Sequence, residues 1–391
     1  MGLARLFMIM LLTVIWDLCC PTWVFAQLQG AFRSSQGKYD IPHSEISEHQ
    51  FQSFWRSRIY GESTSLETQS AEVAGLDIFS ENRYKLIERI EARVFLRAKF
   101  ESGRAQSFFG DIEPANAILV REAALKVTPL DPISLKVGVL DQDWLDTRMF
   151  LYSQSFPGAR AQGAFDIFKN FHLGLASQYL IPTSQTLSAR TMDREPSPHL
   201  VTHTVYGNYD LGVYFLRASY NTFDYSVLPS QVAFDSQITG NSSRFIGGPN
   251  NSAFEFDFKG WFADIEAGVQ LHPRVEFVAL YNIIKNTAAP ETFNDGHVIG
   301  VGTKVDFEDH IVKLSYENFF AESDVVPSFY SSWVYGKTNK EGQGVDLSVQ
   351  FKKHNFRVRT QFYQADVINF NGLQEDQKYF FLGVETGYDK I

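Results

Sequence analysis

The stretch Val345–Lys352, VDLSVQFK, decides how this chain folds. Its Val, Leu, Val and Phe side chains alternate one by one with Asp, Ser, Gln and Lys. Successive side chains of a β-strand point to opposite faces of a sheet, so this alternation predicts a strand with one apolar and one polar face. After the polar break Lys353–Asn355 we expect a second strand over Phe356–Gln364, and a third strand after the loop at Asn371–Gly372.

The same pattern recurs through most of the chain, as hairpins with short turns that are separated by longer loops. Short turns are expected at about residues 130, 168, 209, 273, 309 and 354, and long loops over 182–199, 221–253, 284–296, 320–343 and 367–377. Bacterial membrane barrels keep short turns on the periplasmic side and long loops outside the cell. We therefore predict an all-β fold, a transmembrane antiparallel β-barrel over residues 83–391 with about fourteen strands.

Two segments leave the number of strands open. Residues 27–82 are polar and lack a sustained period, which predicts a periplasmic or plug-like segment. If the region Phe51–Tyr60 instead adds a pair of strands, the barrel has about sixteen. The segment Leu86–Phe100 alternates along its whole length and so favours a single strand, although its apolar spacing also fits a helix.

The N-terminal residues 1–26 have the features of a secretory signal peptide. Arg5 gives a positive start, a short apolar run follows, and Val24–Ala26 forms a plausible cleavage site. The only two cysteines, Cys19 and Cys20, would be removed with this peptide, which excludes a disulfide framework. We expect an exported protein that lies in the outer membrane of a Gram-negative bacterium.

Composition agrees with a membrane barrel and argues against nucleic acid as a partner. The chain has 35 Lys and Arg against 45 Asp and Glu, and its net charge is −10. Aromatic residues make up 15% of the chain, as expected for girdles at the two membrane interfaces. A soluble sandwich or propeller also alternates, but it has no reason to alternate short and long connections.

Two segments resemble parts of Gram-negative outer-membrane porins of the general or anion-selective kind. Leu135–Leu145 is similar to the strand that leads into their constriction loop, and Phe156–Ala161 is similar to the strand by which that loop returns. One departure is the C-terminus, because porins usually end in Phe or Trp and this chain ends in Ile391. The resemblance implies a passive channel for small hydrophilic solutes, with no enzymatic activity and no cofactor. It also implies outer-membrane lipid and lipopolysaccharide as partners, and a homotrimer as the assembly.

If the polar side chains at alternate positions of each strand line the lumen, the inner wall carries a ladder of basic residues. The candidates for this pore lining are Arg89, Arg93, Arg97, Lys99, Lys136 and Arg160. The first three repeat every four residues, a step of about 13 Å at the rise of a strand. A cationic wall would favour anions, whereas the simpler expectation, unselective diffusion of polar solutes, allows for the acidic residues that lie among these cations.

Asp141, Asp143 and Asp146 are candidates for the constriction loop, where they would face Arg160 or the basic ladder across the lumen. In the alternative interpretation they are solvated side chains of an ordinary outer loop. The sequence predicts no metal site and no catalytic arrangement. Two other classes of function stay open, a non-conducting barrel that acts through its outer loops in adhesion or structure, and a barrel hydrolase with a Ser–His pair at its rim.

Overall fold

The computed structural model describes residues 51–106, 114–144, 149–183, 196–245, 252–387 and 389–390. Sixteen long strands and the two-residue β19 form one antiparallel sheet. The long strands are β1 (Phe51–Ser65), β2 (Ser70–Ile87), β3 (Ile90–Gln106), β4 (Ala117–Leu130), β5 (Ile133–Asp141), β6 (Ser155–Phe168), β7 (Phe171–Leu180), β8 (His199–Asp210), β9 (Tyr214–Ser226), β12 (Lys259–His272), β13 (Val275–Asn286), β14 (Asp295–Asp306), β15 (His310–Ala321), β16 (Lys340–Phe351), β17 (Phe356–Val367) and β18 (Gln377–Thr386).

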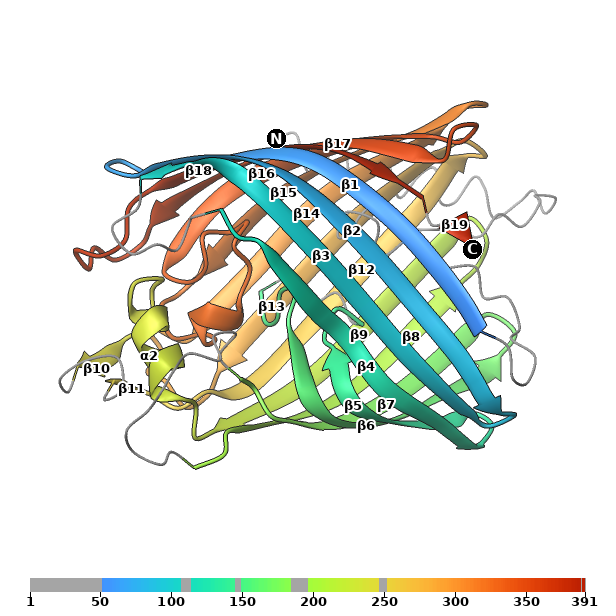
Figure 1. The fold of residues 1–391 in the computed structure, drawn as a ribbon, viewed down its shortest axis with the longest axis horizontal. Helices are drawn as coiled ribbons and strands as arrows, with labels where there is room; N and C mark the ends of the chain where they lie inside the picture. The colour runs from blue at the N-terminus through green and yellow to red at the C-terminus, as the bar shows by residue number, and fades with distance from the viewer. Residues whose placement is uncertain are drawn as a thin grey trace.

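The other elements are short. They are the strands β10 (Ser243–Phe245), β11 (Ser252–Phe254) and β19 (Asp389–Lys390), the helix α2 (Ser230–Gln237) and the 3-10 helix η2 (Ser328–Tyr330). Figure 1 shows α2 with β10 and β11 at one end of the barrel and the C-terminus at the other end. Among the described residues, no helix is long and apolar enough to cross a membrane.

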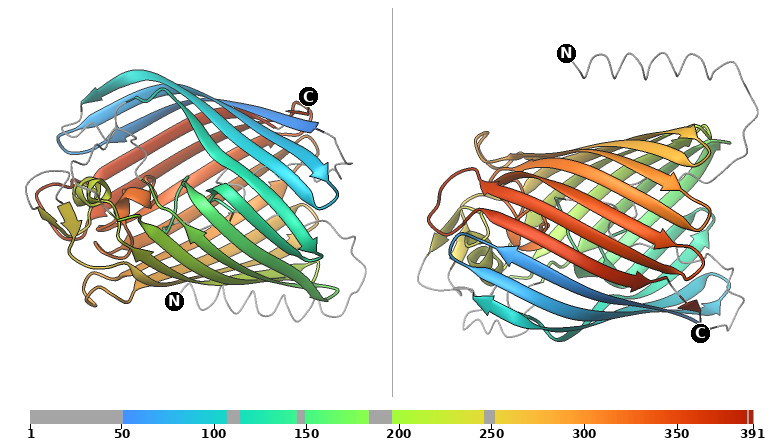
Figure 2. Two further views of the ribbon diagram at one scale, coloured as in Figure 1. Left: turned by 60° about the horizontal axis from the view of Figure 1, so that its bottom comes forward. Right: turned by 90° about the horizontal axis from the view of Figure 1, so that it is seen from above.

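The sheet closes on itself, because β1 pairs with β18 as well as with β2. The closing register runs from Arg58 opposite Glu385 to Ser65 opposite Lys378. Two views of the barrel in Figure 2 show the closed wall, with the first strands in blue beside the last strands in red. Closure gives every long strand two neighbours, so no strand edge is left open. The predicted antiparallel barrel is confirmed.

The strand count of fourteen is corrected to sixteen, the alternative that the sequence left open. The additional pair is β1 and β2, so the described residues of 27–82, which begin at Phe51, lie in the barrel wall. The segment Leu86–Phe100 is neither one strand nor a helix. It contains the end of β2, a tight turn at Glu88–Arg89 and most of β3.

The connections alternate in length, as the sequence predicted. One end of the barrel carries the short turns 88–89, 131–132, 169–170, 211–213, 273–274, 307–309 and 352–355. The opposite end carries the connections 66–69, 107–116, 142–154, 181–198, 227–258, 287–294, 322–339 and 368–376. Only the first of these, 66–69, is as short as a hairpin turn.

Side chains at alternate positions of each strand face opposite sides of the barrel wall. On β13 the inward side chains, such as Glu276 and Asn282, are buried, while the outward Phe277 and Tyr281 are exposed. Outward side chains on the other strands are also largely apolar, with Val301 57% and Leu382 48% exposed. A continuous apolar outer surface is far larger than a soluble monomer normally exposes, and it is the surface that a lipid bilayer covers.

The long-loop end of the lumen holds an aromatic and aliphatic core. The ring of Phe150, in the connection 142–154, lies 4.7 Å from Phe223 on β9 and 5.0 Å from Phe262 on β12. Tyr330, in the connection 322–339, packs edge-on against Phe156 at 5.2 Å and stacks on Tyr225 at 6.1 Å. Both connections therefore fold into the barrel. The described part of 142–154 packs on the side of the lumen nearest β6 to β12, whereas 322–339 also reaches β15 and β17, where the Tyr335 ring lies 4.7 Å from Phe319 and 5.9 Å from Tyr363.

Candidate functional site: the charged lumen

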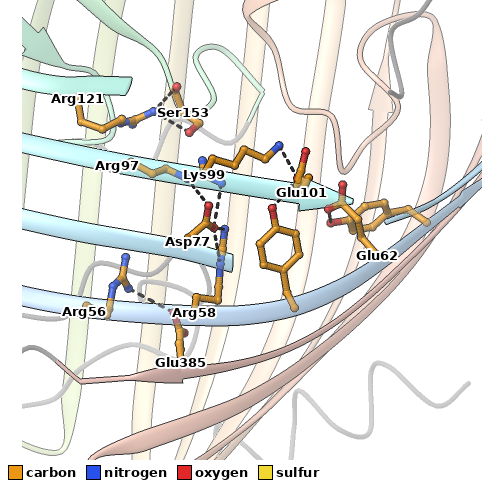
Figure 3. A network of polar contacts seen from close by, with 12 residues as sticks. Arg56, Arg58, Glu62, Asp77, Arg97, Lys99, Glu101, Arg121, Ser153 and Glu385 are labelled. Atoms are coloured by element: carbon orange, nitrogen blue, oxygen red, sulfur yellow. Dashed lines mark hydrogen bonds and ion pairs between the residues drawn. The ribbon is translucent and has the colours of Figure 1, made fainter. Parts of the chain in front are cut away.

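The inner face of β1, β2 and β3 carries arginines that share one carboxylate. Asp77 on β2 is fully buried and accepts two hydrogen bonds from Arg97 on β3, each of 3.0 Å. Arg58 on β1 donates to the same carboxylate from Nε, also at 3.0 Å. Two guanidinium groups thus face a single negative charge (Figure 3).

A second shared carboxylate lies at the seam where the barrel closes. Glu385 on β18 accepts a hydrogen bond of 2.6 Å from Nε of Arg357 on β17. It also pairs with Arg56 on β1, at 3.3 Å. Nearby, Arg359 on β17 is held by Asp346 on β16 at 3.0 Å. The two shared carboxylates together face four arginines.

One aromatic ring supports three of these arginines. The guanidinium carbon of Arg56 lies 4.2 Å from the centre of the Phe79 ring, and those of Arg58 and Arg97 lie at 5.7 and 5.6 Å. Phe79 itself stacks on Phe95 at 6.2 Å. Because a cation is attracted to the face of an aromatic ring, Phe79 restricts where these guanidinium groups can lie.

An acidic group lies on the same wall, nearer the long-loop end. Glu101 pairs with Lys99 at 2.6 Å and accepts hydrogen bonds from the Tyr60 hydroxyl and from the Ala115 amide. Glu62 accepts a hydrogen bond of 3.4 Å from the Tyr379 hydroxyl. Figure 3 shows these carboxylates beyond the arginines along the lumen. The wall thus presents basic and acidic groups in succession.

The structure places five of the six basic candidates on the inner wall. Arg93, Arg97 and Lys99 face inward on β3, and Arg93 pairs with Glu91. Lys136 on β5 pairs with Glu122 at 2.8 Å.

Arg160 on β6 donates to Gln178 at 2.8 Å and to the carbonyl oxygen of Asp141 at 3.0 Å. Its guanidinium also lies 4.3 Å from the Trp144 ring.

Arg89 is the exception and does not join the ladder. It lies in the turn between β2 and β3, at the short-turn end, and is exposed. Its guanidinium donates to the carbonyl oxygen of Pro129 at 2.7 Å, in the neighbouring turn region. The prediction was wrong for this residue because the strand ends at Ile87, so the four-residue spacing does not continue across the turn.

Two of the three acidic candidates meet a different partner from the one expected. Asp141 and Asp143 each lie 2.8 Å from Nη2 of Arg121 on β4, rather than facing the ladder across the lumen. Arg160 donates a hydrogen bond to the carbonyl oxygen of Asp141. Asp146 lies outside the described residues.

The alternating pattern missed Arg121 because a β-bulge breaks it. Phe95 pairs with Glu122 and Leu96 pairs with Val120, so Arg121 is an extra residue on β4. Arg121 and Glu122 can therefore both contact groups inside the barrel, which strict alternation does not allow.

The described residues contain no group of three or more His, Cys, Asp or Glu side chains that could hold a metal ion. They do contain a Ser–His pair on the outer face, where Oγ of Ser177 on β7 lies 3.0 Å from Nδ1 of His203 on β8. Within the described part of the chain, no carboxylate hydrogen-bonds to this histidine.

No protein-family model matches the chain, and no curated protein matches it. Solved structures of outer-membrane proteins are similar to it in fold. The high-pH structure of Pseudomonas putida OprB aligns with a TM-score of 0.56 at 10% identity, over 87% of this chain and 94% of OprB. Salmonella typhi OmpF, solved with daunomycin, aligns with a TM-score of 0.50 at 13% identity, over 89% of this chain and 100% of OmpF. The chain therefore has the fold of a Gram-negative outer-membrane porin, a closed antiparallel β-barrel.

Proposed function

We propose that the protein is a passive diffusion channel of the Gram-negative outer membrane that admits small hydrophilic solutes. One observation carries this proposal, namely that the charged side chains of the inner wall stay partly accessible inside a barrel whose outer face is apolar. The side chains of Arg58, Arg97 and Lys99 are 22%, 17% and 24% exposed. Charged groups at membrane depth are costly unless they face water or a partner, so these groups are expected to line a wet path.

Conductance in planar lipid bilayers tests the proposal. Purified, folded protein should insert in discrete steps of constant conductance. Protein that inserts into the bilayer but never conducts would refute the channel function.

The apolar outer face supports contact with outer-membrane lipid, with the short turns in the periplasm and the long connections outside the cell. We also predict that lipopolysaccharide is a further partner and that the protein assembles as a homotrimer. Chemical cross-linking in native outer membranes tests the trimer, which should appear as a single band of three times the monomer mass.

We also propose that the channel prefers anions. Arg58 and Arg97 share Asp77, and Arg56 and Arg357 share Glu385, so four positive charges face two negative charges on this part of the wall. A local excess of fixed positive charge raises the concentration of anions in the lumen. Reversal potentials in a salt gradient should therefore report a larger anion than cation permeability, and a cation preference would contradict the proposal.

Phe79→Leu tests whether the aromatic support contributes to this preference. Leucine removes the ring face that lies against Arg56, Arg58 and Arg97 but keeps an apolar side chain. We expect the permeability ratio of anions to cations to fall by about two- to fivefold, consistent with loss of about 0.5–1 kcal/mol of cation–π attraction.

Phe215→Leu is a matched control on the other side of the lumen. Its ring lies 4.7 Å from the guanidinium of Arg217, which is already paired with Glu266 at 3.1 Å. Because Arg217 and Glu266 carry one charge of each sign, the reversal potential of Phe215→Leu should equal that of the unmodified protein. Equal shifts in both variants would contradict a specific role for the Phe79 ring.

The aromatic core at the long-loop end favours one alternative, a non-conducting barrel that works through its outer loops. In that case the wild-type protein does not conduct, and deleting residues 325–337 from the core should create conductance.

The barrel hydrolase has weaker support. The Ser177–His203 pair lacks an orienting carboxylate among the described residues, and a serine nucleophile also needs a group that stabilises the oxyanion. An esterase assay with Ser177→Ala as its control tests this alternative.

A further inference from the structure

We infer that Arg121 is a positioning residue that holds the connection 142–154 against the barrel wall and so sets the width of the pore. The effect on pore width rests on the proposed channel function. The position of the connection does not. The experiment below measures the two separately.

The Arg121 guanidinium contacts both ends of this connection. At the outgoing end, Nη2 lies 2.8 Å from Oδ1 of Asp141 and 2.8 Å from Oδ2 of Asp143. At the returning end, Nη1 donates to Oγ of Ser153 at 2.7 Å and to the Ser153 carbonyl oxygen. Asp143 also accepts a hydrogen bond of 3.0 Å from the Ser153 amide, so the two ends are joined directly as well.

This contact is buried, so breaking it costs more free energy than breaking an exposed ion pair. The Arg121 side chain is 7% exposed and that of Asp141 is 12% exposed. Removing the cation leaves two carboxylates close together without their shared partner. Breaking a buried ion pair from one side is strongly destabilising, because the remaining charge is uncompensated.

The β-bulge in β4 is what brings Arg121 into this position. The bulge inserts Arg121 as an extra residue between Val120 and Glu122, each of which keeps a partner on β3. Bulges re-aim a side chain at the expense of local strand pairing, and they are often found beside functional sites. Here the neighbouring Glu122 stays free to pair with Lys136 on β5.

The described returning part of the connection, residues 149–154, packs inside the lumen. Its returning part packs Phe150 against β9 and β12, and the Tyr152 amide donates to the Tyr330 carbonyl oxygen at 2.9 Å. Arg121 thus joins the two ends of the connection, while Phe150 and Tyr152 hold its returning part against the aromatic core and the connection 322–339. Loss of the Arg121 contact should let the returning part leave this position.

A single introduced cysteine reports the position of the connection. Cys19 and Cys20 are first replaced by serine, which removes every native thiol. Met149→Cys then places a thiol at a position that is 4% exposed. The barrel is reconstituted in phosphatidylcholine vesicles and treated with a charged maleimide, and the labelling rate is measured in this background alone and with each Arg121 variant.

Arg121→Gln should raise the labelling rate by at least about tenfold, because release of a buried ion pair shifts local opening by that factor or more. Arg121→Lys keeps the charge but not the fork of donors, so its rate should be intermediate. Arg217→Gln, which breaks the pair with Glu266 on β9 and β12, is the matched control and should leave the rate unchanged. Equal rates in Arg121→Gln and the background would overturn the inference.

If Arg121→Gln does not fold, the loop side of the contact offers a second variant. Asp143→Asn with Ser153→Ala keeps Arg121 paired with Asp141 but removes the charge of Asp143 and the bond to Oγ of Ser153. Only the bond to the Ser153 carbonyl oxygen then joins Arg121 to the returning end, so this double variant should also raise the labelling rate. An unchanged rate in this folded double variant would likewise overturn the inference.

Conductance is measured on the same variants. Faster labelling with larger and noisier single-channel currents supports both the anchor and the channel. Faster labelling in a protein that never conducts supports the anchor and refutes the channel. Unchanged labelling in a conducting protein refutes the anchor alone.

Discussion

Glu385 on β18 accepts hydrogen bonds from arginines on two other strands and so connects the first strand of the barrel with the last two. Its side chain is 5% exposed, as is that of Arg357, and that of Arg56 is 6% exposed. A buried carboxylate with two cationic partners is compensated in full. Without Glu385, Arg56 and Arg357 would keep their buried positive charges but lose the carboxylate that they share.

Glu385→Gln should therefore destabilise the closed barrel. The substitution keeps the volume and one carbonyl oxygen but removes the negative charge that Arg56 and Arg357 share. We expect a loss of about 3–5 kcal/mol in the free energy of unfolding. The measurement is urea unfolding in lipid vesicles, followed by tryptophan fluorescence.

Glu266→Gln serves as the comparison, because Glu266 compensates one arginine, Arg217, and does not lie at the seam. Its loss should be smaller than that of Glu385→Gln. Equal losses would mean that sharing a carboxylate across the seam adds nothing to stability.

At the scale of single residues, sequence alone could predict an inward side chain only where a strand is regular. Arg93, Arg97 and Lys99 lie on the uninterrupted part of β3, and alternation places them correctly. Alternation also predicts Arg89 on this face, because no proline or glycine marks the turn at 88–89. The sequence does not predict the inward position of Arg121, because no residue pattern indicates a bulge in β4. The position of a bulge depends on pairing with the neighbouring strand.

Among the larger elements, the two connections 227–258 and 322–339 are tied together by a buried carboxylate. Asp324 is fully buried and accepts hydrogen bonds from the Ser242 amide at 2.9 Å and from the Ser242 and Ser323 hydroxyl groups at 2.7 Å each. Burial raises the pKa of Asp324 above its ordinary value of 3.8, and the hydrogen bonds from Ser242 and Ser323 offset this only in part.

This shift predicts that the two connections are held more firmly in acid. A group whose pKa is raised by folding binds its proton more tightly in the folded state. Its stabilising contribution is complete below the ordinary pKa and is lost as the pH rises through the raised value. Hydrogen exchange of amides in 322–339, corrected for intrinsic rates, should therefore show easier local opening at pH 7 than at pH 4.

Asp324→Asn removes the titrating group but keeps a side chain of the same size that can still accept from Ser242. Local opening in this variant should no longer change between pH 4 and pH 7. A pH dependence that persists in the variant would assign the effect to another group.

Most hairpins could be predicted from the sequence, because each pairs a short turn with two strands whose outward residues are apolar. The hairpin of β1 and β2 could not. In β1 the inward face carries Phe54 and Tyr60, while the outward face includes Ser57 and Ser63 beside Trp55. Apolar residues thus occur on both faces and no period is visible. The inward aromatics are there to pack against arginines, which is a tertiary requirement.

For the whole molecule, the closing seam between β1 and β18 is the feature on which everything else depends. Ser63 lies opposite Phe380 in the register of this seam. Cysteines at directly opposed positions of an antiparallel pair are close enough for a disulfide. Ser63→Cys with Phe380→Cys, in the background without native thiols, should form a disulfide in the folded barrel.

The readout is migration in gels with SDS but no reductant. Unmodified protein should run compactly when unheated and more slowly after boiling, whereas the oxidised double variant should stay partly compact after boiling because its ends remain joined. Ser63→Cys with Leu382→Cys is the control, since Leu382 lies opposite Gly61 and out of register with Ser63. Efficient cross-linking of the control pair would contradict the register.

The shared core of the connections 142–154, 227–258 and 322–339 has a consequence for a bacterium under attack. Antibodies and phages meet surface loops first, and such loops usually tolerate rapid sequence change. Here an escape substitution at Val325 or Tyr330 would also disturb packing inside the barrel, because both side chains are fully buried. We expect variation among natural strains to collect instead in the connection 368–376, where Phe370 is 90% exposed and takes no part in that core.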